Sequence, residues 1–135
     1  FYMPKKIFCK PNEIPDRIAD WSQQIISGLN KKGKVVMAID IIDCEDFPNL
    51  STKIREIIAD VVKNTLEAVP VDELVIEGGA TAYSIITKLQ FERFYPTQEL
   101  APGVIRMKVR ENERLHLTLK PGSYKWPLSI WPYEK

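Results

Sequence analysis

Two glycine turns carry the residues of this sequence that are best suited to binding an anion. The first glycine turn is Glu77-Gly78-Gly79-Ala80-Thr81, and the second is Lys120-Pro121-Gly122-Ser123. Each follows a strand-like apolar run, and the first leads into a helical stretch. A strand that feeds a glycine-rich turn exposes backbone N–H groups to an anion, and phosphate is the usual one.

The residue types within the turns fit this chemistry. Gly78 and Gly79 allow positive φ and close approach of a ligand, and the Thr81 hydroxyl can cap a helix or donate to a phosphate oxygen. Lys120 adds a cation, and Gly122 and Ser123 add a glycine and a hydroxyl that suit a nucleotide phosphate or ribose edge. Each turn alone can equally be a plain tight turn. Their joint occurrence at one end of one sheet predicts a phosphate site.

Other candidate groups have a simpler interpretation. The acidic residues Asp40, Asp43, Glu45 and Asp46 could hold Mg²⁺ through its waters, but a hydrated surface loop is the favoured interpretation. His116 is predicted to share a strand face with Thr118 and Lys120 and to cover a hairpin rather than to catalyse. The aromatic residues near the C-terminus are predicted to pack the tail onto the domain, with adenine stacking as the weaker alternative; they are Trp126, Trp131 and Tyr133. Cys9 and Cys44 form neither a metal-ligand spacing nor a disulfide framework, so no protein metal ligands are predicted.

The elements that must position the turns follow from the apolar pattern. Helices are expected from Ile14 to near Gly33, over residues 50–66 and over 81–89, where apolar residues recur at helical spacing. Strands are expected at 5–10, 34–42, 73–76, 104–108 and 115–119. This order predicts an α/β fold, three-layer and Rossmann-like, with a mostly parallel sheet flanked by helices and a C-terminal antiparallel hairpin.

Composition bounds the class of protein. The chain has 135 residues, 44% hydrophobic and 27% charged, which predicts one globular domain over 1–135. A formal net charge of +1 gives no global field for nucleic acid or a membrane surface, and no apolar stretch suggests a span. We expect a cytoplasmic protein and leave a homo-oligomer open. Phe1 is an unusual first residue for a gene product, so we expect a piece of a longer chain.

Three segments in order resemble a known family. Leu74-Val75-Ile76-Glu77-Gly78-Gly79-Ala80-Thr81-Ala82 is similar to a strand followed by Gly-Gly-acid-Thr-Ala. Glu99-Leu100-Ala101-Pro102-Gly103-Val104 is similar to a Glu-Leu-x-Pro-Gly-Val loop, and Leu117-Thr118-Leu119-Lys120-Pro121-Gly122-Ser123-Tyr124 to a closing Lys-x-Gly-x-Phe-Gly turn. On these motifs the chain resembles the nucleotide-binding C-terminal domain of the four-carbon acid sugar kinases, formerly a domain of unknown function.

The resemblance implies the C-terminal part of a two-domain kinase. It implies ATP with Mg²⁺ as cofactors, ATP contacts from Gly78, Gly79, Ala80, Thr81 and Gly122, and a threonate, erythronate or 3-oxo-tetronate type of substrate. It also implies that the sugar acid binds mainly to an N-terminal domain that this sequence does not contain, so that the chain alone is inactive and its catalytic base is unidentified.

Two positions depart from the family pattern. Ala80 stands where an acid is common, and Tyr124-Lys125 replaces Phe-Gly. Lys125 could meet a phosphate, or the change could crowd the turn. A non-catalytic nucleotide-binding or regulatory module with a degenerate site therefore stays open as the alternative, and so does a structural domain without a ligand.

Overall fold

The structure is a computed structural model that describes residues 1–40 and 47–132. The chain forms two compact units, Phe1–Pro70 and Val71–Lys135. None of the helices in the described residues is long and apolar enough to cross a membrane.

The first unit is built on two long helices. A 3-10 turn, η1 (Pro11–Glu13), leads into α1 (Ile14–Lys32), and α2 is Leu50–Ala68. The predicted helices are confirmed here, and α1 ends where expected. Gly33 takes a left-handed conformation with φ 72°, and its N–H donates to the Leu29 carbonyl at 2.8 Å. Glycine adopts this geometry without steric cost, so it stops the helix.

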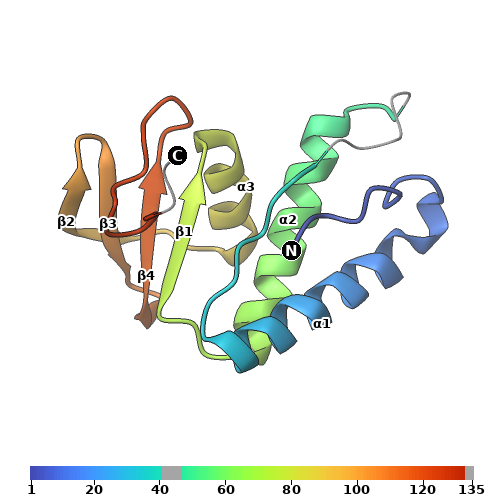
Figure 1. Cartoon of the computed structure of the whole chain (residues 1–135), viewed down its shortest axis with the longest axis horizontal. Coiled ribbons are helices and arrows are strands. Elements are labelled where there is room, and N and C mark those ends of the chain that lie inside the picture. Colours follow the sequence, from blue (N-terminus) through green and yellow to red (C-terminus); the bar gives the residue numbers. More distant parts are fainter. Residues whose placement is uncertain (41–46, 133–135) are drawn as a thin grey trace. The chain divides into compact units, whose positions relative to one another are not determined.

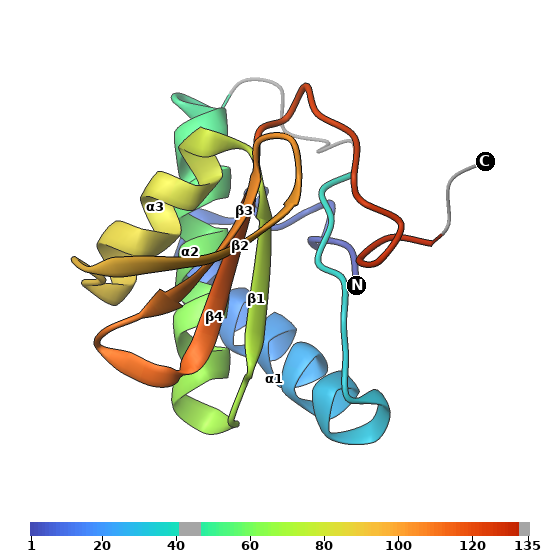
Figure 2. The same cartoon turned by 90° about the vertical axis from the view of Figure 1, so that its left-hand side faces the viewer.

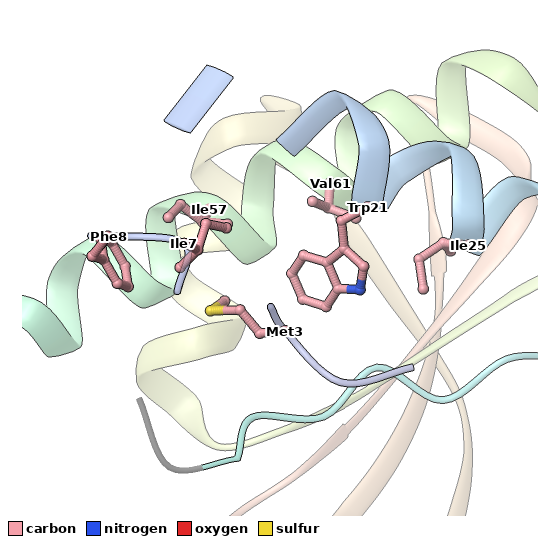
Figure 3. Close-up of a cluster of buried hydrophobic side chains, with 7 residues drawn as sticks. All are labelled: Met3, Ile7, Phe8, Trp21, Ile25, Ile57 and Val61. Carbon is pink, nitrogen blue, oxygen red and sulfur yellow. The ribbon is translucent and has the colours of Figure 1, made fainter. Parts of the chain in front are cut away.

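Large apolar side chains fill the core of this unit (Figure 3). The indole ring of Trp21 from α1 lies near Val61 of α2, and Met3 and Ile7 come from the N-terminal segment. A polar link joins the two helices, because the Asn64 amide donates to the Ser22 hydroxyl at 3.1 Å. Side chains from the N-terminal segment, α1 and α2 thus pack together and give this unit its own hydrophobic core.

Two expected strands of this unit are wrong. Residues 5–8 form turns, with the Ile7 N–H bonded to the Pro4 carbonyl at 3.0 Å. Over residues 34–40 only Ala38 pairs as a strand does, in a single parallel bridge to Tyr2. Val36 and Ile39 are about half exposed, so the apolar run is not covered on both faces. A strand needs a partner along its whole length, and the run's apolar character alone does not supply one.

The second unit is a four-stranded sheet with one helix. Its elements are β1 (Glu73–Glu77), α3 (Gly79–Leu89), β2 (Phe94–Ala101), β3 (Val104–Val109) and β4 (Asn112–Lys120). The strand order is β1-β4-β3-β2 (Figure 1). Figure 2 shows α3 against one face of the sheet. Ile76 of β1, Leu117 of β4 and Ile85 of α3 are buried.

The expected fold class is correct in part. The fold is mixed α/β, and the C-terminal hairpin is confirmed as β3 and β4. The mostly parallel sheet is wrong, because β1–β4 is the one parallel pair in the described sheet and β2–β3 and β3–β4 are antiparallel. Short connections after β2 and β3 allow only antiparallel pairing, since a parallel return needs a dozen or more residues. The three-layer Rossmann-like arrangement is not confirmed.

Candidate functional site

The two glycine turns leave neighbouring parallel strands side by side. Glu77, the last residue of β1, pairs with Lys120, the last residue of β4. One residue further on, the Gly78 N–H donates to the Lys120 carbonyl at 2.9 Å. Both strands point to the same end of the sheet, and α3 begins there (Figure 1). The prediction that the turns meet at one end of one sheet is confirmed.

The first glycine turn presents free backbone at the start of α3. Gly78 has φ 91°, which only glycine adopts readily, and it precedes the helix. The first helical bond runs from the Ala82 N–H to the Gly78 carbonyl at 3.0 Å. The N–H groups of Gly79, Ala80 and Thr81 therefore precede the helical ladder, as the first N–H groups of any helix do. Thr81 is the third residue of α3, so its hydroxyl lies within the first turn.

Both turns have glycines whose surface is open. A Cβ built on Gly79 would meet no atom of the described chain within 4 Å, and the same holds for Gly122. Gly122 and Ser123 are exposed, and the second turn closes through a 3.1 Å bond from the Tyr124 N–H to the Pro121 carbonyl. A ligand oxygen can thus reach the backbone at either turn.

Lys120 joins the two turns from inside. Its side chain is buried, and the ammonium donates to Glu77 Oε1 at 2.9 Å, to the Pro121 carbonyl at 3.1 Å and to the Tyr124 carbonyl. The indole N–H of Trp126 donates to the other Glu77 oxygen at 2.9 Å, and the ammonium lies 5.0 Å from the Trp126 ring centroid. The three protons of the ammonium are therefore directed at protein atoms.

The family motif at Glu99–Val104 lies at the same end of the sheet, because Ile105 at the start of β3 pairs with Leu119 near the end of β4. Gly103, in the turn between β2 and β3, has φ 75°, and a Cβ there would lie 3.2 Å from the ring of Tyr124. Its N–H donates to Glu99 Oε1 at 3.1 Å. Trp126 packs against this unit, as expected of the tail, but its partners Glu77 and Lys120 and the contact of Tyr124 with Gly103 were not predicted. No local sequence pattern specifies these contacts, because they depend on which strands pair and in which register.

Two acidic residues at the start of β1, Asp72 and Glu73, are held by partners on β3 and β4. Arg106 donates to Glu73 from Nε at 3.0 Å and from Nη2 at 2.9 Å, and the Thr118 hydroxyl donates at 2.7 Å. Desolvation acts to raise the pKa of Glu73, but the hydrogen bonds from Arg106 and Thr118 outweigh it and the pKa is lowered. Arg114 binds Asp72 and lowers the pKa of that carboxyl in the same way. These charges are satisfied within the sheet.

The remaining candidates do not join this site on what the structure describes. Asp43, Glu45, Asp46 and Cys44 lie outside the described residues, as does Tyr133, and Asp40 pairs with Lys5 at 3.3 Å. His116 pairs with Glu73 and Lys108 in the sheet register, four residues before Lys120. The described residues contain no group of three or more His, Cys, Asp or Glu side chains that could hold a metal ion.

A model of the family described as "nucleotide-binding C-terminal domain" matches residues 3–124. A search of curated proteins gave no match.

Solved structures share the fold at low identity. A Bordetella bronchiseptica domain of unknown function, DUF1537, crystallised as a domain-swapped dimer with bound citrate, is 14% identical with a TM-score of 0.63, and the match covers 85% of this chain and 29% of that one. A Haemophilus influenzae protein of the DUF1537 family model is 19% identical with a TM-score of 0.62, covering 94% of this chain and 32% of that one. A putative tRNA synthase from Salmonella typhimurium is 12% identical with a TM-score of 0.60, covering 82% and 28%. The chain thus spans about a third or less of each of these proteins.

Proposed function

The chain belongs to the family of nucleotide-binding C-terminal domains, the family that its motifs resemble, and on that premise we propose that it binds ATP at the two glycine turns. One observation carries the proposal. The Gly78 N–H bond to the Lys120 carbonyl holds the two turns side by side at the open end of β1 and β4.

The backbone supplies most of the phosphate contacts in this proposal. The N–H groups of Gly79, Ala80 and Thr81 point along the first turn of α3, where the helix dipole favours an anion. Gly122 and Ser123 approach from the second turn, and the hydroxyls of Thr81 and Ser123 add side-chain donors. Lys120 contributes to the site by hydrogen bonding to residues of both turns.

The parent protein is proposed to be a cytoplasmic kinase of a four-carbon sugar acid of the threonate, erythronate or 3-oxo-tetronate type. A separate N-terminal domain would hold the sugar acid. The γ-phosphoryl group of ATP would pass to the sugar acid in a cleft between the two domains. Phosphoryl transfer depends on positioning and charge neutralisation, so this chain alone would bind nucleotide without turning over. Neither nucleic acid nor a membrane is a proposed partner.

Magnesium would enter this site with the nucleotide. Both oxygens of the Glu77 carboxylate accept hydrogen bonds from Lys120 and Trp126, and Ala80 contributes no carboxylate. The described residues therefore fit an ion held by the phosphates and by water, which is how Mg²⁺ is often bound with nucleotides.

A non-catalytic nucleotide-binding module is the second candidate. Ala80, exposed in the first glycine turn, favours it, because the acid common at this position is missing. The two candidates differ in whether the full-length protein transfers phosphate from ATP to a sugar acid.

Calorimetric titration with Mg-ATP, Mg-GTP and ADP tests the shared proposal. We expect saturable binding in the micromolar to millimolar range, or about −8 to −4 kcal/mol. No binding to this chain and none to the full-length protein would refute it.

A further inference from the structure

We propose that Lys120 is a positioning residue, a clasp that sets the spacing of the two glycine turns for a phosphate group without itself binding the phosphate. The inference rests on the proposed function. It adds a distinction between the turn residues that contact the phosphate and Lys120, which keeps those turns in place. The inference is based on the contacts of the Lys120 ammonium. We call Lys120, Glu77 and Trp126 together the clasp.

The contacts of Lys120 reach both glycine turns. Glu77 is the residue before Gly78, so its 2.9 Å bond to the ammonium fixes the entry to the first turn. The Pro121 and Tyr124 carbonyls flank Gly122 and Ser123, so the same ammonium fixes both ends of the second turn. Tyr124 also packs against Gly103, and this contact links the Glu99–Val104 motif to the clasp.

Burial makes this arrangement costly to open. Lys120 is 3% exposed, and its ammonium already donates to three oxygens and faces the Trp126 ring. A buried charge that loses its partners is strongly unfavourable, so the ammonium is held where it is. A lysine that binds phosphate directly would have to give up its hydrogen bonds to Glu77 and to two carbonyl groups. The geometry thus favours a structural hold over a direct contact.

Two variants of the clasp give opposite expectations for the two roles. Glu77→Gln keeps the size of the side chain and removes the charge that holds the ammonium. If Lys120 bound phosphate directly, freeing it would leave nucleotide affinity unchanged or raise it. If Lys120 is a clasp, Glu77→Gln and Lys120→Met both loosen the turns, and both should weaken ADP binding by about tenfold or more.

Two matched controls separate this effect from loss of charge and loss of stability. Lys108→Met removes a positive charge from an exposed position on β3, and Leu115→Ala removes a fully buried apolar side chain early in β4. The register places Lys108 opposite His116, four residues before Lys120, and Leu115 lies one residue earlier still on β4. Affinity for ADP should stay within about twofold in both controls, even though Leu115→Ala lowers the melting temperature.

Amide hydrogen exchange of the ligand-free chain supplies a readout that does not need nucleotide. The clasp predicts faster exchange in residues 78–82 and 121–124 together in both Glu77→Gln and Lys120→Met, with neither control showing it. Unchanged exchange in these turns, or unchanged or stronger ADP binding by Glu77→Gln, would overturn the inference. Faster exchange in both variants, together with no nucleotide binding by either the wild-type chain or the full-length protein, would support the clasp and refute the proposed function instead.

Discussion

A pair of adjacent glycines allows a sharp test of the phosphate site, because their substitution should affect different properties. Gly79 has open space around its Cβ position and a φ outside the left-handed range, whereas Gly78 has φ 91°. Gly79→Val should therefore fold and Gly78→Val should be strained. The two variants carry the same added side chain one residue apart.

The expected magnitudes follow from this geometry. A valine at position 79 would cover the N–H groups at the start of α3, and loss of one or two charge-assisted hydrogen bonds costs about 1.5–3 kcal/mol each. Nucleotide affinity should thus fall by about tenfold to a hundredfold or more. Stability should change by roughly 0.5 kcal/mol, as is usual for an exposed position. In Gly78→Val the strained backbone should cost about 1–3 kcal/mol of unfolding free energy.

Calorimetry with Mg-ATP and thermal unfolding, run on both variants and the wild type, measure these effects. A Gly79→Val chain with wild-type affinity would refute the placement of phosphate on the first turn. A Gly79→Val chain that unfolds as readily as Gly78→Val would refute the reading of its open surface instead.

Three further predictions concern the other turn, the missing carboxylate and the sheet. Gly122→Val should likewise weaken nucleotide binding by about tenfold or more while keeping the melting temperature, and calorimetry that finds wild-type affinity would contradict a role for the second turn. Ala80→Asp should tighten Mg-nucleotide binding by restoring a carboxylate, and an equal or larger dissociation constant would dismiss that explanation. Glu73 has a lowered folded pKa, so its stabilisation is complete above its ordinary pKa of 4.5 and is lost as pH falls through the folded pKa. Denaturant unfolding from pH 7 to pH 2 should show Glu73→Gln losing part of this acid sensitivity, and parallel curves for the two proteins would count against it.

The sequence allowed correct prediction of the elements with local signals. Helical spacing indicated α1, α2 and α3, and alternation indicated β3 and β4, because each pattern reflects contacts made within or between neighbouring segments. The run at 34–42 failed as a buried strand because strand formation depends on distant partners that an apolar run does not specify. The side-by-side turns were predictable from the strand assignment alone.

The interior of the site was harder to predict. Lys120 was expected to offer its charge to a ligand, and the structure directs it to Glu77, 43 residues away. Only the register between β1 and β4 brings these two residues together, and register is not written in the composition of either turn. The roles of the seven predicted site residues, Gly78, Gly79, Ala80, Thr81, Lys120, Gly122 and Ser123, stay predictions for the experiments above.

The parallel pairing of β1 with β4 also has a consequence for the order of folding. The turns between β2, β3 and β4 close short loops, whereas pairing Glu77 with Lys120 closes a segment of 43 residues. Long loops cost more entropy and form later, so we expect the three-strand meander to fold first and β1 to dock afterwards. The two glycine turns would then come together in the last step. A nucleotide would accordingly slow unfolding and leave the folding rate nearly unchanged.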